Sequence, residues 1–260
     1  MTPTLQHLTV ERAGGLARVT LNRPPANALN LELIDELALV AKMLSDDDTR
    51  VVLLGSALPI FMAGADLVHM VDSGWDAVRS TIVRFQSAVN DWESIPGATI
   101  AVINGHAAGG GCELTLACDW RLMARGRPRI GLPEGPKGLL PAGGGTQRVV
   151  RLLGRGRAMD MCVRGRLIDA DDAERIGLVH EALDPDRLDA RAEELAEELL
   201  GLPQMTLRAV KRCILRGGDT DVLSGLKIEE DEMSALGATH DAREGVRAFV
   251  EKRPPVFRHE

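Results

Sequence analysis

Two glutamates, Glu113 and Glu134, stand in glycine-rich stretches 21 residues apart. Glu113 directly follows Gly109-Gly110-Gly111-Cys112, and Glu134 lies in a segment of Gly, Pro and apolar residues from Arg129 to Arg148. Two acids beside free backbone N–H groups suit chemistry at the carbons next to a carbonyl, because one group moves a proton while the N–H groups hold the developing oxyanion. The alternative is that both glutamates are ordinary surface or helix-capping residues.

The residues around Glu113 have the pattern of a strand, a turn and a helix. The apolar run Ile100–Ile103 predicts a buried strand, and Asn104-Gly105 ends it. The spacing of apolar residues over 112–117 then predicts a helix. A glycine-rich turn of this kind lets the backbone approach a ligand closely, with the N–H groups of the helix start pointing outward. We therefore expect Glu113 in the first turn, beside these donors.

The rest of the chain predicts an α/β body followed by helices. The segments 17–21 and 50–55 read as strands, and the apolar face of 31–44 predicts a helix between them. From residue 184 onward the pattern is helical, and we place a boundary near 201–203, giving a core domain of 1–200 and a C-terminal helical region of 201–260. Further predicted elements are strands at 7–11, 119–124 and 177–182 and helices at 75–92, 146–153, 157–163, 186–200, 205–216, 219–236 and 241–252. Another helix is expected to be capped by Asp169 or Asp171 and to end at Ile176.

Composition excludes several classes of protein. The 260 residues carry a net charge of −7, no Tyr, four Phe and three Trp, which argues against a nucleic-acid surface with its basic face and aromatic platforms. The four cysteines form no C-x-x-C pair, as expected for reduced thiols of a cytoplasmic protein. No apolar run approaches the ~20 residues that span a bilayer, and no leader pattern opens the chain, so we expect no membrane association.

Familiar catalytic motifs are missing from the sequence. It has no G-x-S-x-G, no phosphate-binding G-x-x-x-x-G-K-[ST] and no H-E-x-x-H. The six histidines are scattered, so we expect no metal, and His106 is more typical of a loop residue that faces solvent or a ligand. The two glutamates remain as the candidates for chemistry.

Five motifs in order resemble the enoyl-CoA hydratase/isomerase (crotonase) family. They are Thr20–Leu29, Phe61–Leu67, Asn104–Glu113, Pro133-Glu134 with Gly144–Arg148, and the closing Glu244–Arg253. The resemblance covers essentially the whole chain. It implies the crotonase-like (ClpP/crotonase) fold, a spiral of ββα units with a C-terminal α-helical trimerisation region, assembled as a homotrimer or as a hexamer made of two trimers.

The resemblance also implies a role for each matching residue. The backbone N–H groups of Ala65 and Gly110 would form an oxyanion hole for a thioester carbonyl. Glu113 and Glu134 match the two glutamates that jointly hold one water; we assign water activation to Glu113 and protonation of C2 to Glu134. The substrate is an acyl-CoA thioester, and no cofactor is implied beyond the coenzyme A that the substrate carries.

Coenzyme A contacts are carried over in the same way. The backbone of Ala63 matches the position that contacts the adenine, and the other matching positions are Arg23, Asp66, Leu67, Phe249 and Lys252. Two lysines that family members often have near the phosphates are replaced, by Pro25 or Ala26 and by Val68. Phosphate contacts would then fall on Arg23, on His69 and on Lys252, the last reaching the coenzyme A of a neighbouring subunit. The family's P-G-x-G-G reads Pro141–Gly145 here, a change in the wall of the acyl pocket.

Three functions fit these observations. The presence of both glutamates favours an enoyl-CoA hydratase that converts a trans-2-enoyl-CoA into a 3-hydroxyacyl-CoA, in fatty acid β-oxidation or related acyl-CoA catabolism. The first alternative is a Δ3,Δ2-enoyl-CoA isomerase or another crotonase-type enzyme, since isomerases usually keep only the second glutamate. The second alternative is a non-catalytic paralogue that binds coenzyme A or RNA; the two acids and the negative net charge argue against it.

Overall fold

A six-stranded sheet forms the centre of the chain. The computed structural model describes residues 5–259, without the side chains of 67–73. The sheet has the order β1-β2-β3-β4-β6-β8; β1 and β2 are antiparallel and the other neighbours are parallel. Its strands are β1 (Leu8–Ala13), β2 (Leu16–Leu21), β3 (Val51–Ser56), β4 (Ala98–Ile103), β6 (Trp120–Ala124) and β8 (Glu181–Leu183). All six residues of β4 are buried, as expected for a parallel strand covered on both faces.

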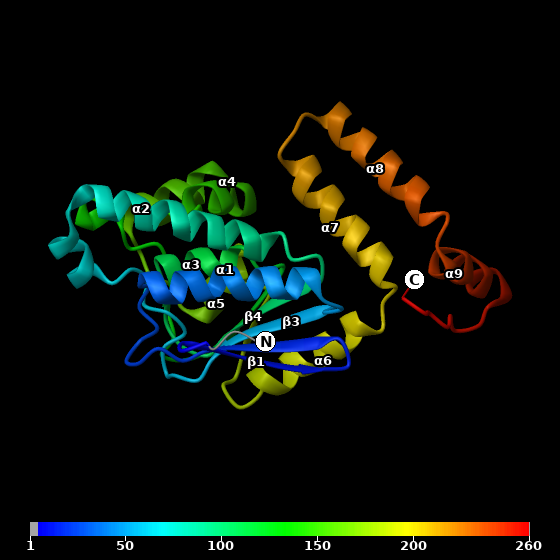
Figure 1. The fold of residues 1–260 in the computed structure, drawn as a ribbon, viewed down its shortest axis with the longest axis horizontal. Coiled ribbons are helices and arrows are strands. Elements are labelled where there is room, and N and C mark those ends of the chain that lie inside the picture. The colour runs from blue at the N-terminus through cyan, green and yellow to red at the C-terminus, as the bar shows by residue number, and fades with distance from the viewer. Residues whose placement is uncertain (1–4, 260) are drawn as a thin grey trace.

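Helices cover both faces of this sheet (Figure 1). One core packs α1, α2, α3 and α5 on one face, and a second core packs α6 on the other. The bounds are α1 (Leu31–Asp46), α2 (Leu67–Glu93), α3 (Gly110–Leu116), α4 (Gly145–Arg164), α5 (Ala170–Ile176), α6 (Leu188–Leu200), α7 (Gln204–Gly218), α8 (Val222–Leu236) and α9 (His240–Glu251). The α/β class and the helical C-terminal part are confirmed.

The predicted secondary structure differs from the observed bounds in three places. The strand expected at 177–182 begins only at Glu181, because Gly177 has a φ of 84° that ends α5, and the N–H groups of Leu178 and Val179 turn back to the carbonyl of Ala173. The helix expected at 75–92 begins earlier, since a helical segment from Leu67 precedes a kink at Gly74. The two helices expected at 146–153 and 157–163 are joined as α4 around a similar kink at Gly154.

A small second sheet places the loops of the two glutamates side by side. Its strands are β5 (Ala107–Ala108) and β7 (Ile130–Gly131), which pair in parallel. β5 directly precedes α3, and β7 precedes the short 3-10 helix η1 (Gly135–Lys137). The chain after β7 therefore runs next to the start of α3.

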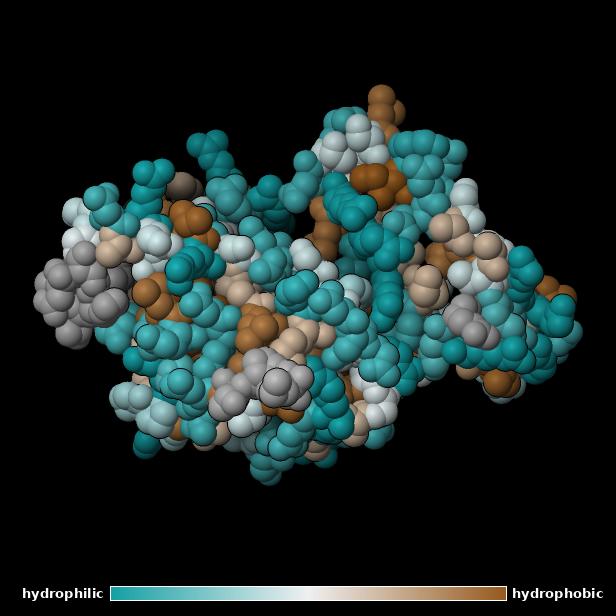
Figure 2. Space-filling model, viewed as in Figure 1, coloured by the Kyte–Doolittle hydropathy of each residue, from teal (hydrophilic) through white to brown (hydrophobic). Residues whose placement is uncertain are grey.

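The helices α7, α8 and α9 extend away from the sheet in Figure 1. A buried lysine attaches α7 to the sheet: Nζ of Lys211 donates to the carbonyl of Gly97 at 3.0 Å and to Oδ2 of Asp119 at 2.8 Å. Apolar side chains on these helices are exposed, and Figure 2 shows some of them over α7 and α8. They include Val210, Ile214, Val222, Leu223, Leu226, Met233, Val246, Phe249 and Val250. The domain boundary near residue 201 stays a prediction.

Candidate active site

Gly109 makes the turn between β5 and α3. Its φ of 54° favours glycine, and a Cβ at this position would clash with Oε1 of Glu134. The N–H of Gly109 donates to the carbonyl of Gly131 at 2.9 Å, which fixes the turn against β7. Gly110 is the first residue of α3, so its N–H has no acceptor within the helix.

The segment from Phe61 to Asp66 lies between this turn and Leu29. The N–H of Ala108 donates to the carbonyl of Met62 at 3.0 Å. On the other side, the bridge between Leu29 and Ala65 uses the N–H groups of Leu29 and Asp66. The N–H of Ala65 stays outside that bridge, because alternate N–H groups of an extended chain point to opposite sides. A Cβ at Gly64 would lie 3.3 Å from the nitrogen of Gly110, so the two segments are in close contact.

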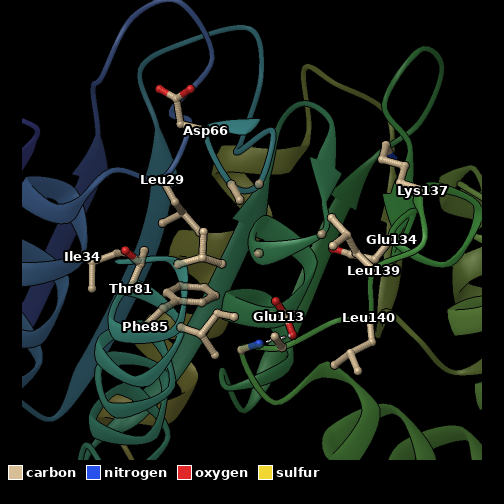
Figure 3. A pocket seen from close by; sticks show the side chains of 18 of the residues that line it. Leu29, Ile34, Asp66, Thr81, Phe85, Glu113, Glu134, Lys137, Leu139 and Leu140 are labelled. Atoms are coloured by element: carbon tan, nitrogen blue, oxygen red, sulfur yellow. Dashed lines mark hydrogen bonds between the residues drawn. The ribbon is translucent and has the colours of Figure 1, made fainter. Parts of the chain in front are cut away.

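A cavity of about 550 Å³ opens between these segments, α2 and the loop 133–143. Figure 3 shows Leu29 and Phe85 on one side of it, Leu139 and Leu140 on the other, and the two glutamates facing the space between them. Most of the lining is apolar. It consists of Leu29, Asn30, Leu31, Ile34, Ala63, Gly64, Ala65, Asp66, Trp75, Val78, Thr81, Ile82, Phe85, Gly109, Gly110, Glu113, Pro133, Glu134, Lys137, Gly138, Leu139, Leu140, Ala142 and Gly143.

Glu113 lies in the first turn of α3 and is only 3% exposed. Its Oε1 accepts the backbone N–H of Gly143 at 2.7 Å and that of Gly145 at 2.8 Å. Burial raises the pKa of Glu113 to about 7; the charge of Glu134 adds to this, and the two N–H bonds and Arg148 oppose it. A carboxyl with this pKa exchanges protons readily at neutral pH.

Glu134 faces the same cavity from the residue before η1. Burial raises its pKa as well, partly offset by a backbone hydrogen bond and by Lys137. Its Oε2 is a buried atom without a hydrogen-bond partner among the described side chains and backbone groups, which leave out the side chains of 67–73. A buried carboxyl oxygen without a hydrogen bond costs free energy unless a ligand or a water molecule donates a hydrogen bond to it. The structure thus brings together two acids with raised pKa values.

The residues predicted to bind coenzyme A fall into two groups. Ala63 and Asp66 line the cavity, and Nη2 of Arg23 lies 3.7 Å from Oδ2 of Asp66 at its edge. Phe249 and Lys252 lie elsewhere, with Phe249 exposed on α9 and Lys252 at its C-terminal end. The structure does not bring these two to the cavity of their own chain. The side chains of Leu67 and His69 lie outside the described residues.

Three features of the site escaped the sequence analysis. The N–H donors Gly143 and Gly145 were assigned only to a pocket wall, although a run of three glycines is itself a signal of close backbone approach. Phe85 lies in the helix expected at 75–92, where no residue was assigned to a site, yet it lines the cavity. Arg148, the last residue of its motif, contacts this loop.

Among the described side chains, those of residues 5–66 and 74–259, there is no group of three or more metal-ligating side chains. Nδ1 of His106 accepts the N–H of Arg129 at 3.1 Å, so this ring supports a loop. In the same residues, no helix combines the length and apolar character needed to cross a membrane.

Comparison with known proteins gives a consistent result over the full length. The model of the enoyl-CoA hydratase/isomerase family matches residues 11–260. A "Probable enoyl-CoA hydratase" of Rhizobium meliloti is 38% identical, with 97% of this chain and 98% of that protein covered. A "Crotonyl-CoA hydratase" of Syntrophomonas wolfei is 34% identical over 97% and 98%. The crystal structure of an enoyl-CoA hydratase from Bacillus anthracis superimposes with a TM-score of 0.92 at 36% identity, covering 98% of this chain and all of that one (100%).

Proposed function

The chain belongs to the enoyl-CoA hydratase/isomerase family, and from this premise we propose that it adds water across the 2,3-double bond of a trans-2-enoyl-CoA to give a 3-hydroxyacyl-CoA. The crotonase-like fold agrees with this membership. The observation that carries the proposal is the pairing of Glu113 and Glu134 across one cavity, both with raised pKa values. An isomerase, which moves a proton between carbons of the substrate, has no need of a second acid to activate water.

The proposed mechanism uses the two acids for different protons. Ionised Glu113 removes a proton from the water as its oxygen bonds to C3 of the enoyl group. The electrons of the double bond move toward the thioester and form an enolate, and protonated Glu134 delivers its proton to C2. The products are the 3-hydroxyacyl thioester, a protonated Glu113 and an ionised Glu134. Proton exchange between the acids and solvent restores the starting state.

The backbone N–H groups of Ala65 and Gly110 form the proposed oxyanion hole. Both residues line the cavity, the bridge to Leu29 does not use the N–H of Ala65, and Gly110 begins a helix. Fixed donors of this kind stabilise the enolate oxygen without reorganising, and one donor in a comparable site contributes roughly 3 kcal/mol. The donors therefore supply a large part of the proposed rate enhancement.

We also propose that coenzyme A is held by residues of two subunits. The backbone of Ala63 would contact the adenine, and Arg23, Asp66 and Leu67 would lie near it in the same chain. Phe249 and Lys252 would come from a neighbour in a homotrimer or hexamer. The exposed side chain of Phe249 and the other apolar residues exposed on α7, α8 and α9 support such an assembly.

The test is turnover of enoyl-CoA thioesters. Crotonyl-CoA and longer enoyl-CoAs are mixed with the protein, and the loss of the conjugated enoyl-thioester absorbance is followed. We expect loss with the wild type and a large decrease in Glu113→Gln and Glu134→Gln. No loss with any chain length contradicts the hydratase, and tight binding without turnover leaves a binding protein. Loss that survives both substitutions contradicts the site.

A further inference from the structure

Arg148, in the first turn of α4, is fixed by residues of α2. Its guanidinium donates to both carboxylate oxygens of Glu93, at 2.8 and 2.7 Å, and to Oδ1 of Asn90 at 2.8 Å. The side chain is 12% exposed. A bidentate pair of this kind sets both the position and the plane of the guanidinium.

The remaining nitrogen of this guanidinium reaches the loop that holds Glu113. Nη1 of Arg148 lies 3.4 Å from the carbonyl oxygen of Gly143, and a Cβ at Gly144 would clash with this nitrogen. From α2, Nε2 of Gln86 donates to the carbonyl of Ala142 at 2.6 Å. Side chains thus hold the carbonyl groups of the loop, while its N–H groups bind the glutamate.

The two carboxyl oxygens of Glu113 have different surroundings. Oε1 takes both N–H bonds from the loop, at 2.7 and 2.8 Å, so the carboxyl is oriented by the peptides of Gly143 and Gly145. Oε2 is then available to the cavity. If the loop peptides turn, both bonds to Oε1 are lost together.

We propose that Arg148, anchored on α2 by Glu93, is a positioning residue that fixes the Gly143–Gly145 loop and thereby aims Glu113 at the water of the reaction. The inference rests on the proposed function, because it deepens the role of Glu113. It also connects two parts of the site: α2 carries the anchor Glu93 and, through Phe85, a wall of the cavity.

The charges around Glu113 give this role a measurable signature. Glu134, after β7, raises the pKa of Glu113, and Arg148 on α4 lowers it. The neighbouring thiols of Cys112 and Cys162 have raised pKa values and stay neutral, and Lys137 acts on Glu134. Loss of Arg148 removes a positive charge and loosens two N–H bonds, and both changes raise the pKa of Glu113 further.

The experiment compares Arg148→Gln with wild type in the pH dependence of kcat/KM for crotonyl-CoA. We expect the limb of the profile that is set by the ionisation of Glu113 to move to higher pH by about 0.5–1 unit. We also expect kcat to fall with little change in KM, and part of the activity to return at high pH. Arg151→Gln is the matched control, since Arg151 is an exposed residue of the same helix that pairs with Asp219, and its limb should stay in place. Arg148→Lys should return the limb toward that of wild type.

The variant Glu93→Gln tests the anchoring of Arg148 separately from the positive charge of Arg148. This variant keeps the cation and loses its charged partner, so kcat should fall while the limb moves less than in Arg148→Gln. The double variant Arg148→Gln/Glu93→Gln, which leaves no unpaired charge, should lose no more activity than Arg148→Gln alone, because both residues act on one loop. An unmoved limb in a folded Arg148→Gln protein, or an equal loss of activity at every pH, overturns the proposal.

A second readout is independent of turnover. The titration of Glu113 is followed by carboxyl carbon NMR, as the signal absent from Glu113→Gln, in wild type and in Arg148→Gln. A higher midpoint in the variant supports the role of Arg148 even if no enoyl-CoA is hydrated, and an unchanged midpoint overturns it. Failure of the hydratase proposal is seen separately, in the wild type alone.

Discussion

The ring of Phe85 lies where a side chain at position 143 would stand. A Cβ at Gly143 would clash with Cε1 and Cδ1 of this ring and would lie 2.8 Å from Oε2 of Glu113. Gly143 has no side chain, and the ring of Phe85 on α2 occupies the space that a side chain there would take. The same glycine provides an N–H donor to Glu113.

Gly143→Ala should consequently decrease kcat for crotonyl-CoA hydration by about 10-fold or more, because the added methyl displaces Phe85 or Glu113 from its place. The double variant Gly143→Ala/Phe85→Leu should recover part of the loss, since the smaller side chain frees the space. Gly156→Ala is the control, because a Cβ there meets no atom within 4 Å. Steady-state kinetics of the three variants check the prediction, and a Gly143→Ala enzyme with wild-type kcat would contradict it.

The pH dependence of kcat/KM should be bell-shaped. Turnover requires Glu113, whose pKa is about 7, to be ionised and Glu134, whose pKa is also raised, to be protonated. The rate should therefore fall at low pH, where Glu113 is protonated, and at high pH, where Glu134 is ionised. The two apparent pKa values belong to the pair, because the charge of Glu134 raises the pKa of Glu113. A rate that is independent of pH between 5 and 9 would show that these groups do not control turnover.

Glu113→Gln should stabilise the fold at pH 8 and not at pH 5. The folded-state pKa of about 7 exceeds the ordinary 4.5, so the folded chain holds a proton that the unfolded chain releases, and stability falls as the pH rises between the two values. The amide oxygen of Gln accepts the same two N–H bonds without the cost of a buried charge. The gain at pH 8 is at most about 3 kcal/mol. Thermal melting at both pH values checks this, with Glu197→Gln, exposed on α6, as the control that should show no such difference.

Lys252→Glu should raise KM for crotonyl-CoA several-fold and leave kcat nearly unchanged. The proposed role of this lysine is a phosphate contact with the coenzyme A of a neighbouring subunit, and a carboxylate there repels the phosphate. Crotonyl-pantetheine, which has no phosphate, is the matched substrate, and its KM should not change. An equal effect on both substrates would mean that the substitution acts through the fold or the assembly.

Local patterns predicted most elements because their signals are contained within each element. The face of 31–44 appears as α1, whose first turn is capped by the side chain of Asn30, and the run 100–103 lies within β4. The strand expected at 177–182 was wrong in its first part, because Leu178 and Val179 are buried by packing after a helix rather than by pairing in the sheet. An apolar run indicates burial, and burial has more than one cause.

Some residues of the candidate site could likewise be predicted from local sequence, and others could not. Glu113 and Glu134 were singled out from their own surroundings, and the structure brings both to one cavity. The bonds from Gly143 and Gly145 to Glu113 join residues 30 and 32 positions apart, and the pair of Phe85 with Gly143 joins α2 to a distant loop. Contacts of this range depend on the tertiary packing of the loops, which no local spacing encodes.

The buried contact of Lys211 has a mechanical consequence. Its ammonium group donates to the carbonyl of Gly97, the residue before β4. The other end of β4 leads through Ala107-Ala108 to the turn at Gly109. The six residues of β4 are buried and span roughly 20 Å of stiff backbone. This strand thus lies between the Lys211 contact of α7 and the loop that leads to Gly110, the proposed oxyanion donor. Movement of those helices therefore acts on one end of a stiff strand whose other end leads to the turn with the proposed oxyanion donor.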